Sequence, residues 1–241
     1  MTEHIVEAFT ELAPRYERTM DRELRFMWGL GYRDFVRRLV RAAEIREGSC
    51  VLDLCTGTAV IPLSLGAETG VGVRVVGLDL TPAMLQQGAR GIAQAPARSR
   101  ISLVCGSAMA IALADGSVDA VTCGLGMHHL DVRRTLIEIR RVLAPGGCLI
   151  LGLVGVPALW RTRWGGRIVL GGIRAFYRLT HGGPRAQAET EAFYNIHTEV
   201  EWREILPAYG FDDIAITEIP SRWRWGPSAL FVKAELAAPP Q

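Results

Sequence analysis

The chain has 241 residues, of which 49% are hydrophobic and 22% charged, and its formal net charge is +2. These proportions fit a folded globular protein with a sizeable core and exclude a disordered chain. The near-neutral charge gives no general signal for nucleic acid binding. No run of about eighteen uncharged apolar residues is present that would span a membrane.

Two further features indicate a cytoplasmic protein. The N-terminus carries Glu3, His4, Glu7 and Glu11 among its apolar residues, unlike a secretory signal. The five cysteines are odd in number and include no C-x-x-C pair. The sequence therefore predicts neither a disulfide framework nor a metal site.

The first 45 residues are predicted to be helical. Apolar residues recur there at spacings of three and four, with arginines on the opposite side, as in a helix with one buried face. The clearest set is Phe35, Val36, Leu39, Val40 and Ala43.

From residue 50 onward, predicted strands and helices alternate. The strands are expected over Cys50–Leu54, Val73–Asp79, Ile101–Cys105, Val118–Cys123 and Cys148–Val154. The helices between them are expected over Thr58–Glu68, from Thr81-Pro82 to about Ala93, and from Asp131 to Leu143, after N-cap signals at Thr81 and Asp131. A sharp stop is expected at Pro145-Gly146-Gly147, before the fifth strand.

The remaining residues complete the predicted sheet. A less regular section, 155–197, interrupts the alternation, and a Thr198–Glu201 capping box then starts a helix to about Tyr209. The last two strands, Ile214–Ile219 and Ala229–Glu235, are joined by a connection too short for a helical crossover, so the final strand is expected to be antiparallel. The pattern predicts an α/β fold whose mostly parallel sheet is covered on both faces.

Two acids lie at the expected carboxyl edge of this sheet. Asp53 opens a tight loop after the first strand, and Asp79 ends the second strand. In such sheets, ligands bind beyond the carboxyl ends of the strands, where the strand order reverses. Gly57 lets the backbone approach a ligand, Asp53 can receive an ammonium group, and Asp79 can accept both hydroxyls of a ribose. The loop suits a ligand with an amino acid head and a ribose.

Four motifs, in their order and spacing, resemble a class I S-adenosylmethionine-dependent methyltransferase. They are Asp53-Leu-Cys-Thr-Gly57-Thr58, Val76-Gly77-Leu78-Asp79, Gly124-Leu-Gly-Met-His128-His129-Leu130 and Val142-Leu-Ala-Pro145-Gly146-Gly147. The leader Phe9-Thr-Glu-Leu-Ala13-Pro-Arg-Tyr16-Glu17 is similar to that of the ubiquinone and menaquinone C-methyltransferase group. The resemblance implies a Rossmann-like seven-stranded sheet with N-terminal helices and a helical cap insertion.

The resemblance also implies S-adenosyl-L-methionine as the cofactor. Asp53, Gly57 and Thr58 would hold its methionine end and Asp79 its ribose. Tyr16 would close over it from a helical lid, residues 1–45. The other implied cofactor-binding residues are Cys55, Leu80, Met84, Ser107, Ala108 and Gly124.

The sequence departs from the family pattern in two places. Glycine is common in the family at Cys55 and Ala59, and only Gly57 remains in this loop. Ser107 stands where the family often has an acid that accepts the adenine amino group. A nicotinamide dehydrogenase, the nearest rival, requires G-x-G-x-x-G directly after the strand. This loop has one glycine, and Asp53 would lie unfavourably close to two phosphates.

The implied reaction needs little from the protein. Methyl transfer from a sulfonium is a direct displacement, in which the enzyme mainly aligns the acceptor and excludes water. His128 and His129, just past the fourth strand, are the candidates for a general base. A purely structural histidine pair is the alternative. His197 and Tyr194 are secondary candidates, for which polar contacts within the loop are the favoured interpretation.

Section 155–197 lies where this fold inserts an acceptor-binding cap. Its aromatic residues are Trp160, Trp164, Phe176, Phe193 and Tyr194, and residues 157–185 contain six arginines and no acid. The apolar content favours a hydrophobic or aromatic acceptor. Three interpretations of the arginines stay open: they hold an acidic acceptor, dock the cap on an anionic membrane, or form a solvated face.

The sequence therefore predicts a single methyltransferase domain, residues 1–241, acting on a small hydrophobic, aromatic or quinone-like acceptor. The leader slightly favours C-methylation over O-methylation. Two alternatives stay open: a cofactor-binding fold relative that catalyses a non-methylating reaction such as cyclisation or decarboxylation, and a non-catalytic partner subunit. No nucleic acid partner is expected. Peripheral membrane contact through the basic cap and a homodimer are the partner hypotheses.

Overall fold

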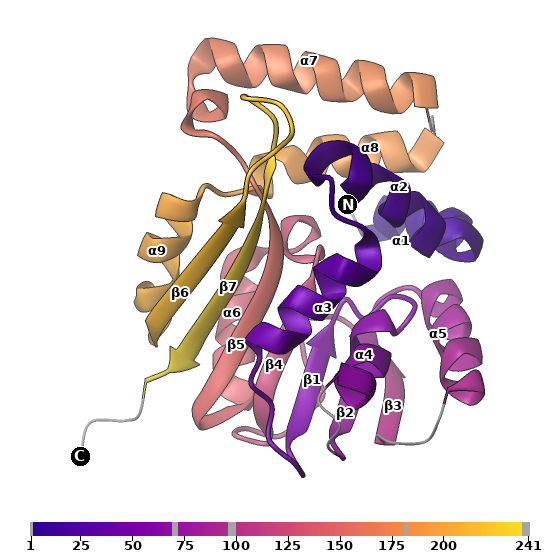
Figure 1. Cartoon of the computed structure of the whole chain (residues 1–241), viewed down its shortest axis with the longest axis vertical. Coiled ribbons are helices and arrows are strands. Elements are labelled where there is room, and N and C mark those ends of the chain that lie inside the picture. The colour runs from indigo at the N-terminus through magenta and orange to yellow at the C-terminus, as the bar shows by residue number, and fades with distance from the viewer. Residues whose placement is uncertain (1, 69–71, 96–99, 181–182, 238–241) are drawn as a thin grey trace.

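The computed structural model, which describes residues 2–68, 72–95, 100–180 and 183–237, contains one seven-stranded sheet (Figure 1). Its strands are β1 (Cys50–Leu54), β2 (Arg74–Asp79), β3 (Arg100–Cys105), β4 (Val118–Gly124), β5 (Leu143–Gly155), β6 (Phe211–Ile219) and β7 (Ser228–Leu236). The order is β3-β2-β1-β4-β5-β7-β6. Strands β1 to β5 pair in parallel, and β7 is antiparallel to both β5 and β6. The predicted mostly parallel sheet with an antiparallel last strand is confirmed.

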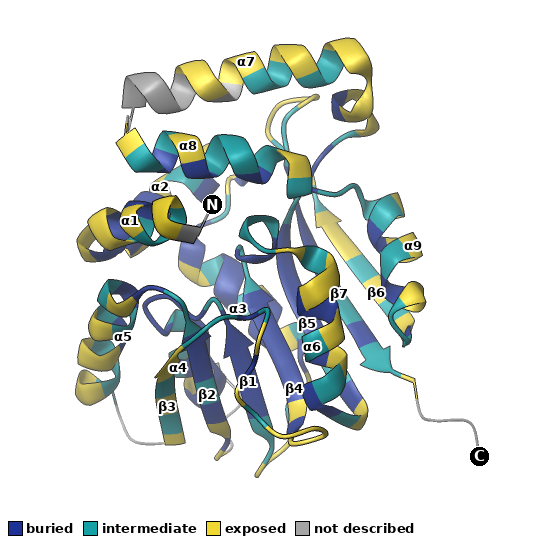
Figure 2. Cartoon of the chain, turned by 180° about the vertical axis from the view of Figure 1, so that it is seen from behind, coloured by how far each residue is buried: buried dark blue, intermediate teal, exposed yellow. Residues whose placement is uncertain are grey.

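Helices cover both faces of this sheet and its carboxyl edge. The helices are α1 (Thr2–Leu12), α2 (Tyr16–Trp28), α3 (Tyr32–Ala42), α4 (Val60–Glu68), α5 (Pro82–Gln94), α6 (Val132–Val142), α7 (Arg163–Thr180), α8 (Gly183–Ala192) and α9 (Glu199–Ala208). Helices α3 and α4 lie in front of the sheet in Figure 1, and α6 and α9 lie in front in Figure 2. Helices α1, α2, α7 and α8 gather beyond the carboxyl ends of β1, β2 and β4.

The core forms two layers because successive strand residues point to opposite faces of the sheet. Val51 and Val75 pack with α3 and α4 in one cluster. Leu52 and Leu54 pack with α6 and α9 in the other. The strands are thus buried on both sides and hold the loops at their carboxyl ends in place.

The largest difference between a predicted and an observed boundary is at the start of the fifth strand. The motif Pro145-Gly146-Gly147 does not separate the preceding helix from the fifth strand. Helix α6 ends at Val142, and β5 begins at the next residue, Leu143. Leu143 pairs with Val118 and Cys148 with Ala120, so extra residues of β5 are accommodated by a shift in register. Gly146 has a φ of 74°, and the motif forms a bulge within the strand.

The section 155–197 is also more regular than expected. Most of it is helical, in α7 and α8 and in the short 3₁₀ helices η3 (Ala158–Arg161) and η4 (Phe193–Asn195). Four glycines within α7 lower its intrinsic helix propensity and obscure the helical signal in the sequence. Packing against α8 and η3 supports the helix instead. The side chains of Phe176 and Arg178 lie outside the described residues.

Within the described residues, none of the helices combines the length and apolar character needed to cross a bilayer. All five cysteines are free thiols.

Candidate active site

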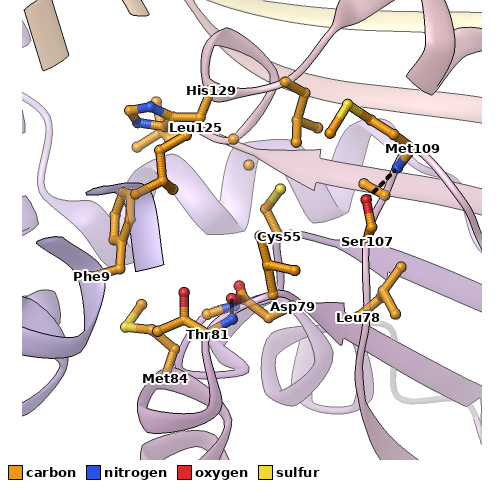
Figure 3. Close-up of a pocket in the computed structure, with 18 of the residues that line it drawn as sticks. Phe9, Cys55, Leu78, Asp79, Thr81, Met84, Ser107, Met109, Leu125 and His129 are labelled. Carbon is orange, nitrogen blue, oxygen red and sulfur yellow. Dashed lines mark hydrogen bonds between the residues drawn. The ribbon is translucent and has the colours of Figure 1, made fainter. Parts of the chain in front are cut away.

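A cavity lies at the carboxyl edge of the sheet, beneath α1. It contains about 840 Å³ of empty space, its open mouth included. The loops that follow β1, β2, β3 and β4 line it, together with Ile5, Phe9 and Tyr16 from the N-terminal helices. Figure 3 shows His129 and Phe9 at one side of the cavity, and Ser107 and Met109 at the other. The position matches the point where the strand order reverses, between β1 and β4.

The loop between β1 and α4 has an unusual backbone. Cys55, Gly57 and Ala59 all have positive φ angles, of 53°, 55° and 60°. A left-handed conformation costs a residue with a Cβ about 1–2 kcal/mol, so the backbone at Cys55 and Ala59 is strained where glycine would not be. A Cβ on Gly57 would lie 3.0 Å from the Met84 Cε atom. The terminal methyl of Met84 would have to move slightly to admit a side chain at Gly57, in addition to the backbone strain.

Asp79 joins two loops at the floor of the cavity. Its Oδ2 atom accepts a hydrogen bond from the Gly57 amide at 2.9 Å, and its Oδ1 atom accepts one from the Thr81 amide at 2.8 Å. Burial raises the pKa of this carboxyl, and the amide hydrogen bonds oppose the shift. A carboxylate has about four lone-pair sites, so Asp79 keeps acceptor capacity for hydroxyl groups of a ligand.

Asp53 is fully buried behind the cavity wall. The Thr122 hydroxyl donates to its Oδ1 atom at 2.6 Å. Burial raises the pKa of Asp53 to about 7, against the lowering effect of the Thr122 hydrogen bond. Its Oδ2 atom and the hydroxyls of Thr56 and Thr58 are buried without a well-formed hydrogen bond among the described residues, although the Thr56 hydroxyl lies near enough to lower the pKa of Asp53. Buried polar atoms of native proteins are normally satisfied, so this loop fits a polar ligand group such as an ammonium.

The structure brings most of the predicted cofactor residues to one cavity. Its wall includes Tyr16, Cys55, Gly57, Asp79, Leu80, Met84, Ser107, Ala108 and Gly124. Asp53 and Thr58 lie beneath the wall and are not part of it. The Ser107 hydroxyl accepts a hydrogen bond from the Met109 amide at 3.2 Å, so its own proton is left to donate.

Several wall residues escaped the sequence analysis. They are Ile5, Phe9, Leu78, Thr81, Gly106, Met109, Leu125, Gly126 and Leu130. The leader motif already contained Phe9, whose ring lies 6.3 Å from that of Tyr16. Most of the others are direct sequence neighbours of predicted residues, and this proximity in the sequence could have identified them as wall residues.

The two histidines of the 3₁₀ helix η2 (Met127–His129) have different positions. His129 lies in the cavity wall, with its ring edge-on to Phe9 at 5.3 Å, and His128 does not line the cavity. Burial lowers the pKa of His128 to about 3. Burial and the Arg185 charge lower the pKa of His129 to about 4. Both imidazoles are therefore neutral at physiological pH.

The secondary candidates lie elsewhere. Tyr194 is exposed, and neither it nor His197 lines the cavity. The His197 Nδ1 atom lies 3.4 Å from the Arg161 guanidinium and 3.7 Å from the Glu201 carboxylate. Arg161, His197 and Glu201 thus form a polar cluster at the start of α9, outside the cavity wall.

A carboxylate from the cap completes a cluster with the histidines. Potential ligand atoms of His128, His129 and Glu189 lie within 4.8 Å of one another. The sequence predicted no metal site, because Glu189 is remote from η2 along the chain. Arg185 lies beside the cluster, with its Nε atom 3.6 Å from Glu189 and its Nη2 atom 2.8 Å from Glu23. A divalent cation bound there would face this buried guanidinium, which already neutralises Glu189.

The sheet order, the cavity at the reversal point and the acids after β1 and β2 define a Rossmann-like methyltransferase fold. The model of the ubiE/COQ5 methyltransferase family matches residues 2–154, and the chain belongs to this family.

Individual relatives agree with this assignment. The chain is 32% identical over 148 residues, 61% of its length, to a demethylmenaquinone methyltransferase of Desulfitobacterium hafniense. It is 33% identical over 158 residues, 65% of its length, to the ubiquinone/menaquinone biosynthesis C-methyltransferase UbiE of Geotalea uraniireducens. These matches span 57% and 66% of the two relatives. Among solved structures, the [4+2]-cyclase SpnF shares the fold, with a TM-score of 0.64 at 16% identity over 86% of this chain and 81% of that one.

Proposed function

We propose that this chain is an S-adenosyl-L-methionine-dependent methyltransferase with a small hydrophobic, aromatic or quinone-like acceptor. The main support is Asp79, whose carboxylate links the Gly57 loop to the start of α5 at the cavity floor. The names of the curated relatives support the quinone-like class and favour carbon as the methylated atom. The proposal treats residues 1–241 as one domain, with 1–45 as lid and 155–197 as acceptor-binding cap.

The residues present fit the proposed cofactor, which supplies an activated methyl group when bound. The polar amino acid end is assigned to the loop of Asp53 and Thr58, whose unpartnered oxygens lie beneath the cavity wall. Asp79 retains acceptor sites for the two ribose hydroxyls. Met84 and Leu80 offer apolar surface to the adenine, and the Ser107 hydroxyl offers it a donor.

The proposed role of the remaining wall is to hold the acceptor and exclude water. Phe9, Leu125 and Leu130 make that side of the cavity apolar, which favours a hydrophobic acceptor. The neutral His129 lies in the same wall and can take a proton from an acidic carbon or hydroxyl of the acceptor. His128 lies outside the wall and supports the His129 ring, at a centroid distance of 4.2 Å.

Replacement of His129 by asparagine is expected to lower kcat by about 10²–10⁴-fold, the usual contribution of a positioned general base. Cofactor affinity should stay within a few-fold. The matched variant His128→Asn should cost much less, because that ring does not line the cavity. Steady-state kinetics and calorimetry check both effects, and equal losses in the two variants would remove His129 from the proposed role.

The lowered pKa of His129 predicts how kcat depends on pH. A base acts when it is unprotonated, so its contribution is present above its pKa and lost as the pH falls through about 4. Between neutral pH and about 5, this group should therefore leave kcat flat.

The proposed function is tested by label transfer. The purified chain is incubated with methyl-labelled S-adenosyl-L-methionine and a prenylated naphthoquinol or benzoquinol. Label in the recovered quinol supports the proposal. Label remaining on the cofactor while the acceptor is converted would favour a non-methylating reaction, an alternative that the shared fold of SpnF keeps relevant. Absence of binding of both the cofactor and S-adenosylhomocysteine in calorimetry would favour a non-catalytic subunit.

The finer points of location and assembly are part of the same proposal. The five free thiols support a reducing, cytoplasmic location. A homodimer stays a hypothesis, which sedimentation velocity tests. Peripheral contact of the basic cap with a membrane is a further hypothesis.

A further inference from the structure

Exposed apolar side chains concentrate at the cap end of the molecule. Six of the ten large apolar side chains exposed among the described residues come from α2, η3, α7 and the β6–β7 connection. We call this set the cap face: Phe26, Leu159, Trp164, Ile168, Trp223 and Trp225. Clustering of such residues on a soluble surface is unusual and marks an interaction site.

Direct contacts connect the segments that carry the cap face. The rings of Phe26 and Trp223 lie 4.5 Å apart, which joins α2 to the β6–β7 connection. The indole nitrogen of Trp160 donates to the Trp225 carbonyl at 2.9 Å, which joins this connection to η3. Helix η3 in turn packs against α7. Figure 1 shows the β6–β7 connection reaching up to α7, which crosses the top of the molecule.

Helix α7 has apolar residues on its outer side as well as its inner side. Val169 packs inward against the small cluster of Val156, Trp160 and Ile196. Trp164 and Ile168, four residues apart and thus on one face, are each 74% exposed. Figure 2 shows most of the described part of α7 as exposed. Tryptophan and isoleucine on the open side of a surface helix, with arginines beside them, are typical of helices that lie in a membrane interface.

The charges that the cap and the β6–β7 connection bring to this surface are of one sign, whereas α2 also carries acids such as Asp21. Residues 157–185 and 220–227 contain no Asp or Glu. Within the described part of the chain, Arg163, Arg167, Arg174, Arg222 and Arg224 form no ion pair. The whole chain has a net charge of only +2, so the positive charge of the cap face is a local concentration.

We propose that the cap face docks on an anionic lipid bilayer. Trp164, Ile168 and the tryptophans of the β6–β7 connection enter the boundary between headgroups and acyl chains, and the flanking arginines bind anionic headgroups. Docking would place the lid and cap, which stand over the cavity, at the bilayer surface, where hydrophobic molecules partition. The inference concerns this surface and does not depend on methyl transfer: vesicle binding tests the surface, and label transfer tests the reaction.

The test is co-sedimentation of the full chain with vesicles of phosphatidylcholine alone, or of phosphatidylcholine and phosphatidylglycerol in equal parts. We expect binding to the anionic vesicles that weakens as salt is added, because salt screens the arginines. Ile168→Ser should weaken the partition by about tenfold, the value of one buried isoleucine side chain. The double variant Arg163→Gln/Arg167→Gln should weaken it by about tenfold or more.

Ile137→Ser is the matched control, because Ile137 is an exposed isoleucine on α6, on a different face. It should bind vesicles like the wild type, and circular dichroism should show all variants folded. Failure of the wild-type chain to bind anionic vesicles at low salt would overturn the proposal. Equal losses in Ile168→Ser and Ile137→Ser would do the same. So would a stable dimer that Ile168→Ser dissociates while vesicles stay unbound, since the cap face would then be a contact between copies.

Discussion

Replacement of Asp79 by alanine is expected to weaken binding of S-adenosylhomocysteine by about a hundredfold. It should also lower the free energy of unfolding by about 2–4 kcal/mol. The carboxylate accepts the amides of Gly57 and Thr81, and both donors would lose their partner at a buried site. The proposed ribose hydroxyls would lose theirs as well. Calorimetry measures the affinity, and urea unfolding measures the stability.

Asp119 supplies a matched control for this experiment. Its carboxylate also accepts a backbone amide, that of Cys50 at 2.7 Å, at the opposite end of the sheet. Asp119→Ala should lower stability by a smaller amount, since the site is exposed, and should leave cofactor affinity unchanged. Wild-type affinity in Asp79→Ala would contradict the ribose assignment, whatever happens to stability.

The second large effect is expected at Asp53. Its pKa of about 7 in the folded chain lies well above the usual 3.8 of the unfolded chain, so the folded state binds the proton more tightly. The resulting stabilisation is fully present below the unfolded pKa and is lost as the pH rises through about 7. The total loss is about 4 kcal/mol. Asp53→Asn removes the ionisation and should remove this pH dependence.

Urea unfolding of the cofactor-free chain over a pH series measures this effect. Below about pH 3, under the unfolded pKa of 3.8, the Asp53 carboxyl is largely protonated in both states, so the variant and the wild type should be about equally stable. Above the folded pKa, the variant should be the more stable protein, by up to about 4 kcal/mol. Cofactor affinity should fall in the variant, because the proposed ammonium partner is gone. Parallel pH curves for the two proteins would show that Asp53 ionises without such a penalty.

The parts of the fold that the sequence predicted well depend on near neighbours along the chain. Strand β1 has the predicted bounds, Cys50–Leu54. The Thr198–Glu201 capping box forms as expected, and Asp131 caps α6 by accepting the Arg134 amide. Each of these signals needs only a run of apolar residues or a side chain three positions from its partner.

The sequence also indicated which residues gather at the candidate site. The motifs placed Asp79, Gly57 and Met84 at one strand edge, and the structure puts all three in the cavity wall. The depth of each residue could not be predicted. Asp53 lies beneath the wall and His129 lies in it, while the adjacent His128 does not. Such differences depend on the φ angles of the loops and on which helix packs above them.

The sequence alone therefore determined the alternation of strands and helices, the acids at the strand ends and the family resemblance. These follow from periodicity, caps and spacing, which are local. Only the tertiary structure decided that Glu189 reaches the η2 histidines, that Arg185 lies between Glu189 and Glu23, and that α2, α7 and the β6–β7 connection share one apolar, basic surface. Those residues are far apart in the chain, and packing of the cap and lid over the sheet brings them together.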